Sequence, residues 1–189
     1  AAVLKRGNAN FVFHPYDWIR NDQMASLVDY ADKTYGKRVK FLTFRECVER
    51  LNKHLLAGQP LRAANGHDNG VRLLDVNGDG FLDVVIGNEQ VRMTRVWDPQ
   101  QHAWDETEFP VQIVTVSADG SRRDAGARFG VLQPTGTASL LVANAETLGV
   151  WHFDGKEWRR DAAMEEGLEL DGEPLMGVLD GRDQGLRLR

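Results

Sequence analysis

The sequence predicts an α+β protein in which a short strand–helix–strand–helix segment precedes a series of small antiparallel β units. Two observations carry this prediction. Residues 1–57 show apolar positions at helical spacing, whereas the chain from residue 71 onward shows short apolar strands separated by turns. The chain has 189 residues and 42% hydrophobic content, which is enough for one large domain or two small ones with a packed core.

The first region contains a predicted strand at residues 11–13, a helix, a second strand at residues 39–44 and a second helix. Asn21 or Asp22 can cap the first helix, and Gly36 can end it. Its apolar positions share one helical face: Met24, Leu27, Val28, Ala31 and Tyr35. Two strands cannot close a sheet, so we expect this βαβα segment to pack on an upstream region or on its neighbour.

The second predicted helix begins at a capping box, because Glu46 lies three residues after Thr43. Its apolar face carries Cys47, Val48, Leu51 and Leu55, and Gly58 closes it. Cys47 is the single cysteine, which excludes an intrachain disulfide, and we interpret it as a small core residue. Residues 58–70 are polar and rich in glycine, and they form the predicted linker between domains 1–57 and 71–189.

The second region repeats. Residues 83–88 align with residues 139–144, and the pair Trp97 and Trp104 aligns with the pair Trp151 and Trp158. A third start at Gly177 echoes Gly130. A period of roughly 50 residues with paired tryptophans indicates stacked β units such as propeller blades, in which the tryptophans are packing residues. We therefore predict an incomplete β-propeller with two blades and the start of a third.

The loop at residues 75–83 places oxygen-bearing side chains at its positions 1, 3, 5 and 9. Calcium prefers six to eight oxygen ligands. The expected ligands are three carboxylates, one amide oxygen and one backbone carbonyl: Asp75, Asn77, Asp79, Asp83 and the carbonyl of Phe81. The EF-hand pattern fits only in part, because position 12 is Ile86 and an apolar strand follows the loop. A turn without metal is the other interpretation, since Asn, Asp and Gly are common turn residues.

Residues 70–88 resemble an FG-GAP (VCBS-type) repeat, and the resemblance extends over residues 70–189 as a series of such repeats. It implies that each repeat is one four-stranded propeller blade and that the loop binds calcium between the first two strands. In the second repeat Val131, Gln133, Thr135 and Ser139 replace the four side-chain ligands, so we expect one calcium ion with a structural role.

His14 follows the strand at residues 11–13, and residues 8–56 resemble the last part of a polysaccharide deacetylase barrel. The resemblance implies that His14 would be the general acid of a metal-dependent hydrolase. An N-terminal loop histidine that caps a turn is the alternative. No Asp-Asp pair and no His-x3-His motif is present, so any catalytic divalent metal would belong to an upstream region and this chain alone is expected to be inactive. We expect His54, His67, His102 and His152 to be single surface histidines.

Net charge is −5, with no basic patch that would favour nucleic acid, and no apolar run reaches the length of a membrane span. The chain starts at Ala1 and ends within an apparent repeat, so we expect a fragment of a longer protein. These features predict a calcium-stabilised, extracytoplasmic binding or scaffold region attached to a carbohydrate deacetylase-like domain, with polysaccharide or an extracellular protein as partner. The alternative is a non-enzymatic adhesion or interaction module with integrin-like repeats.

Overall fold

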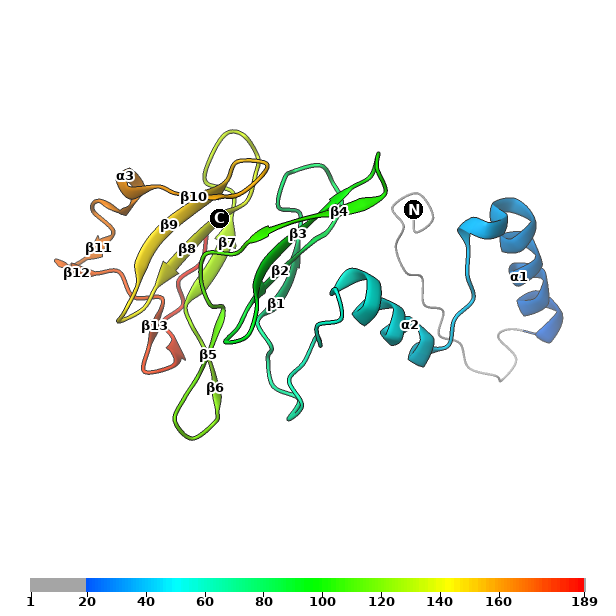
Figure 1. Ribbon diagram of the computed structural model, residues 1–189, viewed down its shortest axis with the longest axis horizontal. Helices are drawn as coiled ribbons and strands as arrows, with labels where there is room; N and C mark the ends of the chain where they lie inside the picture. The colour runs from blue at the N-terminus through cyan, green and yellow to red at the C-terminus, as the bar shows by residue number, and fades with distance from the viewer. Residues whose placement is uncertain (1–19, 189) are drawn as a thin grey trace. The chain divides into compact units, whose positions relative to one another are not determined.

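The computed structural model describes residues 20–188 and divides the chain into two compact units, Ala1–Arg50 and Leu51–Arg189. The described part of the first unit is helical, and the second unit consists mainly of small antiparallel sheets (Figure 1). A mainly β architecture over residues 71–188 agrees with the prediction.

The first unit contains α1 (Asn21–Tyr35), followed by the 3₁₀ turn η1 (Gly36–Arg38). Arg20, not Asn21 or Asp22, holds the N-cap position, and its backbone N–H donates to the side-chain oxygen of Gln23 at 2.8 Å. Gly36 adopts φ +51° and donates its N–H to the carbonyl of Asp32. The helix therefore ends at the predicted glycine, since a left-handed residue closes a helix well.

The second helix, α2 (Phe44–Arg50), begins at the predicted capping box. The N–H and Oγ1 of Thr43 each donate to Glu46 Oε2 at 2.8 Å, and the Glu46 N–H returns a bond to Thr43 Oγ1 at 3.3 Å. The strand predicted at residues 39–44 is wrong. Among residues 20–188 no strand pairs with this segment, and the capping box commits Phe44 to the helix.

The predicted strand at residues 11–13 lies outside the described residues, so the expected βαβα segment is reduced here to its helices. These helices bury no described residue. Cys47 is only partly covered and Val48 is 54% exposed, so the interpretation of Cys47 as a core residue is wrong.

The second unit begins with η2 (Leu51–Leu55), a short π-helical turn, and Gly58 closes the segment that follows it. Gly58 has φ +81° and donates its N–H to the carbonyl of Asn52 at 2.7 Å. Leu56 is 2% exposed and packs on the first sheet against Val71, Val84 and Ile86. The end of the second predicted helix therefore packs as part of the β-rich unit.

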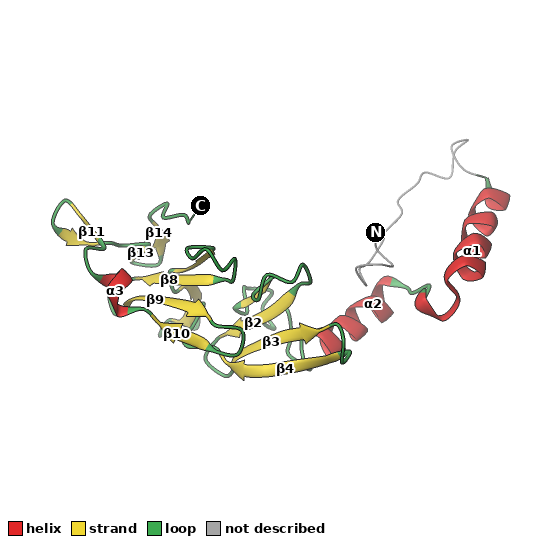
Figure 2. Ribbon diagram, turned by 90° about the horizontal axis from the view of Figure 1, so that it is seen from above, coloured by secondary structure: helices red, strands yellow, loops and turns green. Residues whose placement is uncertain are grey.

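Two four-stranded antiparallel sheets form the centre of this unit, and in each the strands lie in chain order (Figure 2). The first sheet comprises β1 (Val71–Leu74), β2 (Asp83–Gly87), β3 (Arg92–Asp98) and β4 (Ala103–Glu108). The second comprises β7 (Ala127–Gly130), β8 (Ser139–Ala143), β9 (Leu148–Phe153) and β10 (Trp158–Arg160).

One short hairpin follows the first sheet, and a helical turn and two short hairpins follow the second. They are β5 (Val114–Val116) with β6 (Arg122–Asp124), α3 (Ala162–Glu165), β11 (Glu169–Leu170) with β12 (Glu173–Pro174), and β13 (Val178–Leu179) with β14 (Arg182–Asp183). The third repeat start predicted at Gly177 therefore leads into a two-stranded hairpin and not into the first strand of a sheet.

The main hydrophobic core lies between the two sheets. Phe109 and Phe153 are almost completely buried in it, and each contributes about 1.5–3 kcal/mol of transfer free energy. Two polar links cross the same interface. The Ala138 N–H donates to the carbonyl of Val76 at 2.8 Å, and Trp158 Nε1 donates to the buried Thr94 Oγ1 at 2.8 Å. The two repeats are therefore one packed body.

The sheet registers correct the predicted alignment of the tryptophans. Val84 pairs with Arg95, and the equivalent Leu140 pairs with Trp151, so Trp151 occupies the position of Arg95. Trp104 pairs with Trp97, whereas Trp158 pairs with Phe153. The counterpart of Trp97 is therefore Phe153. The β9–β10 turn is two residues shorter than the β3–β4 turn. An alignment that matches the tryptophans by their equal spacing is therefore shifted by two residues.

Candidate metal centre

The loop at residues 75–83 joins β1 to β2, so its last residue, Asp83, is also the first residue of a buried strand. Gly78 and Gly80 adopt φ of +78° and +84°, which lets the backbone turn tightly around the side chain of Asp75. Asp75 Oδ1 accepts from the N–H groups of Gly78 at 2.8 Å and Asp79 at 3.1 Å, and its Oδ2 accepts from Gly80 at 2.7 Å. Asp75 therefore organises the loop from inside.

Asn77 and Asp79 extend the same pattern on the exposed side of the loop. Asn77 Oδ1 accepts from the Asp79 N–H at 3.1 Å, and Asn77 Nδ2 donates to Asp79 Oδ2 at 3.2 Å. Asp79 Oδ1 accepts from the N–H of Phe81 at 2.8 Å. Each side chain thus bonds the backbone two residues ahead, as in an Asx turn.

Asp83 is completely buried and ties the loop to the sheet. Its Oδ2 accepts from the Val76 N–H at 2.9 Å and its Oδ1 from the Trp97 N–H at 2.8 Å. Burial raises the pKa of Asp83 above its ordinary value; its two hydrogen bonds oppose this rise, and the charges of Asp79 and Asp75 add to it. A nearby cation would offset the desolvation free energy of the buried Asp83 carboxylate.

The donor chemistry of the loop fits a hard cation, since carboxylate and amide oxygens are the ligands that calcium prefers. The geometry is that of a hydrogen-bonded turn: within residues 20–188 no three or more His, Cys, Asp or Glu side chains converge closely enough to hold a metal. Oxygens that accept one backbone N–H keep a second lone pair for an ion. All five predicted ligands therefore lie in one loop, and calcium binding there remains a prediction.

The corresponding loop of the second repeat lacks the carboxylates, as its sequence indicates. Ser139 stands where Asp83 stands in the first repeat and is also completely buried. Its Oγ accepts from the Leu132 N–H at 3.1 Å, which reproduces the bond from Val76 to Asp83. The second bond differs, because Ser139 Oγ is joined to His152 Nδ1 at 2.8 Å.

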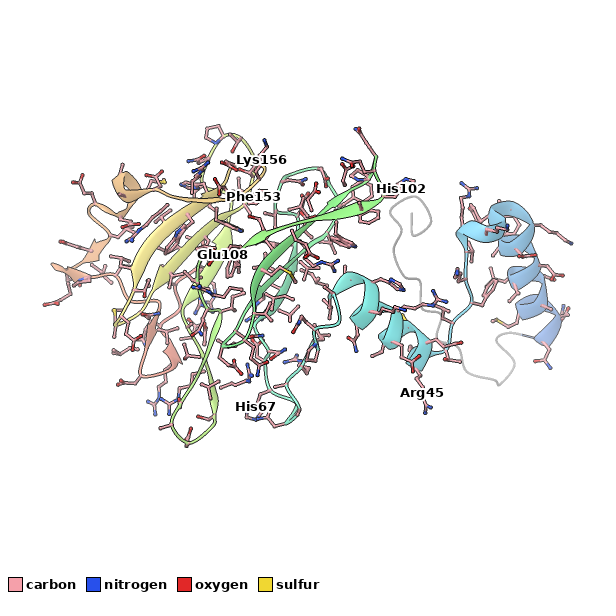
Figure 3. The ribbon with its side chains drawn as sticks, in the orientation of Figure 1. Arg45, His67, His102, Glu108, Phe153 and Lys156 are labelled. Atoms are coloured by element: carbon pink, nitrogen blue, oxygen red, sulfur yellow. The ribbon has the colours of Figure 1, made fainter. Side chains whose placement is uncertain are left out.

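The histidines are not a uniform surface set. His54, His67 and His102 are exposed, and Figure 3 shows His67 and His102 on separate loops of the second unit. His152 is only 6% exposed, so its expected surface position is wrong. It lies in β9, whose central residues are all buried. His14, the expected general acid, lies outside the described residues.

A repeated motif escaped the sequence reasoning. Asp-x-Gly-x-Arg occurs three times, and the first two copies are 56 residues apart. In each copy the Gly N–H donates to the Asp Oδ1 and the Arg pairs with the same Asp. The pairs are Asp68–Arg72 at 2.7 Å, Asp124–Arg128 at 2.9 Å and Asp183–Arg187 at 2.7 Å. The first two copies precede or enter the first strands of the two four-stranded sheets, and the third copy begins at Asp183, the last residue of β14. A search for identical spacing would have found it.

The fold and the loop define a repeat protein whose units are four-stranded antiparallel sheets linked by a shared core. A family model described as FG-GAP repeat matches residues 69–95, which include β1, the loop, β2 and part of β3. No curated protein and no solved structure matches the chain. The deacetylase-like interpretation of the N-terminal piece therefore has no support from these comparisons. In the part of the chain that the structure describes, helices long and apolar enough to span a membrane are absent.

Proposed function

We propose that the β-rich unit is a propeller-type binding or scaffold module in which calcium stabilises the first blade. The observation that carries the proposal is the FG-GAP repeat at residues 69–95. Two sheets of four strands, packed face to face through one core, are the arrangement expected of neighbouring blades. Blades of this type present loops at their edges, which suits contact with a partner.

Three features of the loop support calcium as its ligand. Asp75, Asp79 and Asp83 place three carboxylates within nine residues. Asp83 carries a buried charge that a cation would stabilise. The loop is already ordered by its own hydrogen bonds, so binding would have to bring the carboxylates together but would not have to fold the loop. A single loop of this kind is expected to bind weakly, in the range of about 10⁻⁴–10⁻³ M found in extracellular modules. This affinity favours an extracytoplasmic location and an extracellular protein or polysaccharide as partner.

The first test is the melting temperature of the protein in chelator and in millimolar calcium. Asp79→Asn removes one carboxylate but keeps an oxygen that can accept from Phe81. We expect calcium to raise the melting temperature of the wild type and to have little effect on this variant. Asp119→Asn is the matched control, because Asp119 is also an exposed aspartate that accepts a backbone N–H two residues ahead, from Ser121.

An equal calcium response in Asp79→Asn and the wild type would exclude the loop as the calcium site. A response lost also in Asp119→Asn would indicate a general charge effect. No response in any protein would leave the repeat module without its proposed metal.

A hydrolase role gains no supporting observation. The deacetylase resemblance needs a strand at residues 39–44, and this segment forms none; its other element, with His14, lies outside the described residues. The non-enzymatic binding module is therefore the function that we propose.

A further inference from the structure

We propose that a cavity in the second repeat binds a neutral sugar residue, either as a free sugar or at the end of a glycan. This inference rests on the proposed function, because it names a partner for the binding module, but its site is separate from the calcium loop. The cavity is lined by the second repeat alone and lies beside the β9–β10 hairpin, where Figure 3 labels Phe153 and Lys156.

The cavity has a volume of about 430 Å³, which is within the range of about 300–1,000 Å³ typical of small-molecule sites. Three segments line it: the β7–β8 loop, the β9–β10 hairpin and the start of α3. All the lining residues except Phe153 and Ala162 have polar side chains. The hollow therefore suits a ligand that makes many hydrogen bonds.

The two arginines of the lining are already paired with carboxylates. Arg159 Nε donates to Asp154 Oδ2 at 3.0 Å, and Arg160 Nε donates to Glu165 Oε1 at 2.7 Å. Each carboxylate holds its guanidinium in place and compensates its charge. A phosphate would have to displace these carboxylates, so the arginines do not form an anion site.

The remaining carboxylate of the lining, Asp161, also has its partners within the protein. Its Oδ2 faces His152 Nε2 at 3.3 Å, and its Oδ1 accepts from the Met164 N–H at 3.2 Å. The other imidazole nitrogen is bound to Ser139 Oγ at 2.8 Å. Within residues 20–188 no third ligand-type side chain joins this pair to form a metal site. With its charges compensated, the cavity fits a neutral ligand.

Hydroxyl and amide groups complete the lining. Thr135 Oγ1 and Thr137 Oγ1 lie 3.0 Å apart, and Gln133 has both an amide donor and an amide acceptor. A sugar ring carries several neighbouring hydroxyls, each of which can donate and accept, and it carries no charge. It therefore matches a small hollow in which donors and acceptors lie side by side.

The equivalent loop of the first repeat shows what has changed. Gln133 and Thr135 occupy the loop positions of Asn77 and Asp79, at an offset of 56 residues that Ser139 and Asp83 confirm. Neutral oxygens thus replace carboxylates in the second loop. The two repeats therefore present equivalent loops with different chemistry, one suited to a cation and one to a neutral polar ligand.

The binding should be weak, because the cavity offers no aromatic face for a sugar ring to stack on. Phe153 is the one aromatic residue of its lining and is only 1% exposed. Apolar contact would come from Ala162 and from the methylene stems of the arginines. Hydrogen bonds then supply most of the affinity, and we expect a dissociation constant on the order of 1 mM.

The test is an NMR titration of the whole ¹⁵N-labelled chain with single neutral sugars: glucose, galactose, mannose, fucose, xylose and N-acetylglucosamine. Glucuronic acid, glucosamine and inorganic phosphate are the charged comparisons. We expect at least one neutral sugar to shift the amide signals of residues 133–137 and 152–162, and the charged compounds to bind more weakly.

Thr135→Val and Thr137→Val each remove one hydroxyl with little change of shape. Thr115→Val is the matched control, because Thr115 lies in β5 and does not line the cavity. We expect the affinity for the responding sugar to fall about fivefold in each site variant, as for the loss of one neutral hydrogen bond, and to stay unchanged in the control.

Three results would overturn the proposal: no shifts with any sugar far above the expected dissociation constant, equal affinities in site variants and control, or tighter binding of a charged compound. An oligosaccharide that ends in the responding sugar distinguishes the two sources. Equal or tighter binding than the free sugar indicates a glycan end, and weaker binding indicates a free sugar.

The calcium proposal can fail independently of this one. Asp79→Asn should bind the sugar as the wild type does, and Thr135→Val should keep the calcium response. A lost calcium response with intact sugar binding would count against the metal alone, and the reverse would count against the sugar site alone.

Discussion

At the scale of single residues, the two repeats show how one position can be anchored in two ways. Asp83 and Ser139 hold equivalent buried positions at the start of the second strand of each sheet. Asp83 accepts two backbone N–H bonds, whereas Ser139 accepts one and binds His152. The buried carboxylate of Asp83 is stabilised by two backbone N–H donors. The neutral hydroxyl of Ser139 has one backbone donor and His152 as its second partner.

The pKa values of two aspartates should be shifted in opposite directions from the ordinary value. The Arg72 guanidinium lowers the pKa of Asp68, and burial raises the pKa of Asp83. The stability from Asp68 is present above its unfolded-state pKa and is lost as the pH falls through the lower folded value. The contribution of Asp83 has the opposite sign: it is present at low pH and is lost as the pH rises through the raised value.

The measurement is an NMR titration of the side-chain carboxyl carbons in chelator. We expect the Asp68 midpoint below that of an exposed aspartate and the Asp83 midpoint above it. Adding calcium should lower the Asp83 midpoint if the ion binds the loop. Midpoints in the reverse order would contradict the described contacts.

At the scale of elements, the Asp-x-Gly-x-Arg motif brings the residue before the first strand of a sheet against the end of the second strand. Gly70 has φ +67°, and a Cβ there would lie 2.3 Å from the carbonyl oxygen of Gly87. Gly126 has φ +82°, and a Cβ there would lie 2.8 Å from the carbonyl oxygen of Ala143. The glycine is therefore required twice, for its backbone angle and for the close approach of the neighbouring strand.

Gly126→Ala tests this requirement against Gly120→Ala. Gly120 has a similar φ of +78° but nothing within 4 Å of a Cβ. The backbone strain of about 1–3 kcal/mol is common to both variants, so the additional loss in Gly126→Ala reports the close approach alone. We expect urea unfolding to show a larger loss for Gly126→Ala. Equal losses would mean that the neighbouring strand can move aside.

Arg128 extends the motif from one repeat to the next. It pairs with Asp124 in its own copy and with Asp183 of the third copy at 3.1 Å, and its Nε donates to the carbonyl of Leu186. Its side chain is largely covered, unlike that of the exposed Arg187. Arg128 therefore connects the second copy of the motif to the third as well as closing its own turn.

At the scale of the whole β-rich unit, residues on both faces of the first sheet are buried. One face of the first sheet packs on the second sheet, and Leu56 with Leu55 covers part of the other. The buried Arg95 supports this arrangement, because it donates to the carbonyls of His54 and Leu55 and pairs with Glu106 at 2.8 Å. The turn after α2 therefore stabilises the first sheet.

Leu56→Ala should lower the free energy of unfolding of this unit by about 2–5 kcal/mol, since it creates a cavity beside Val71, Val84 and Ile86. Leu27→Ala is the control, because Leu27 is an exposed leucine on α1 and should have an effect within about 0.5 kcal/mol. Chemical denaturation followed by tryptophan fluorescence measures both. A loss at Leu56 no larger than at Leu27 would show that the turn does not hold the sheet.

Much of the fold could be predicted from local patterns. The capping box at Thr43 and Glu46, the stop at Gly36 and the apolar strands at residues 83–88 and 139–144 were confirmed, because each depends on neighbours in the chain. The strand at residues 39–44 was wrong, because a strand exists only if another pairs with it. The residues predicted to bind calcium lie in one hydrogen-bonded loop, and both their role as ligands and the ion itself remain predictions.

The sequence by itself determined the repeat, the Asp- and Asn-rich loop at residues 75–83 and the positions of most turns, since these follow from side chains a few residues apart. Only the tertiary structure decided that His152 is buried, that Trp151 takes the place of Arg95 and that Leu56 covers the first sheet. The physical reason is that burial and pairing are set by strand register and by contacts between distant segments. A two-residue difference in one turn is enough to change which side chain meets which partner.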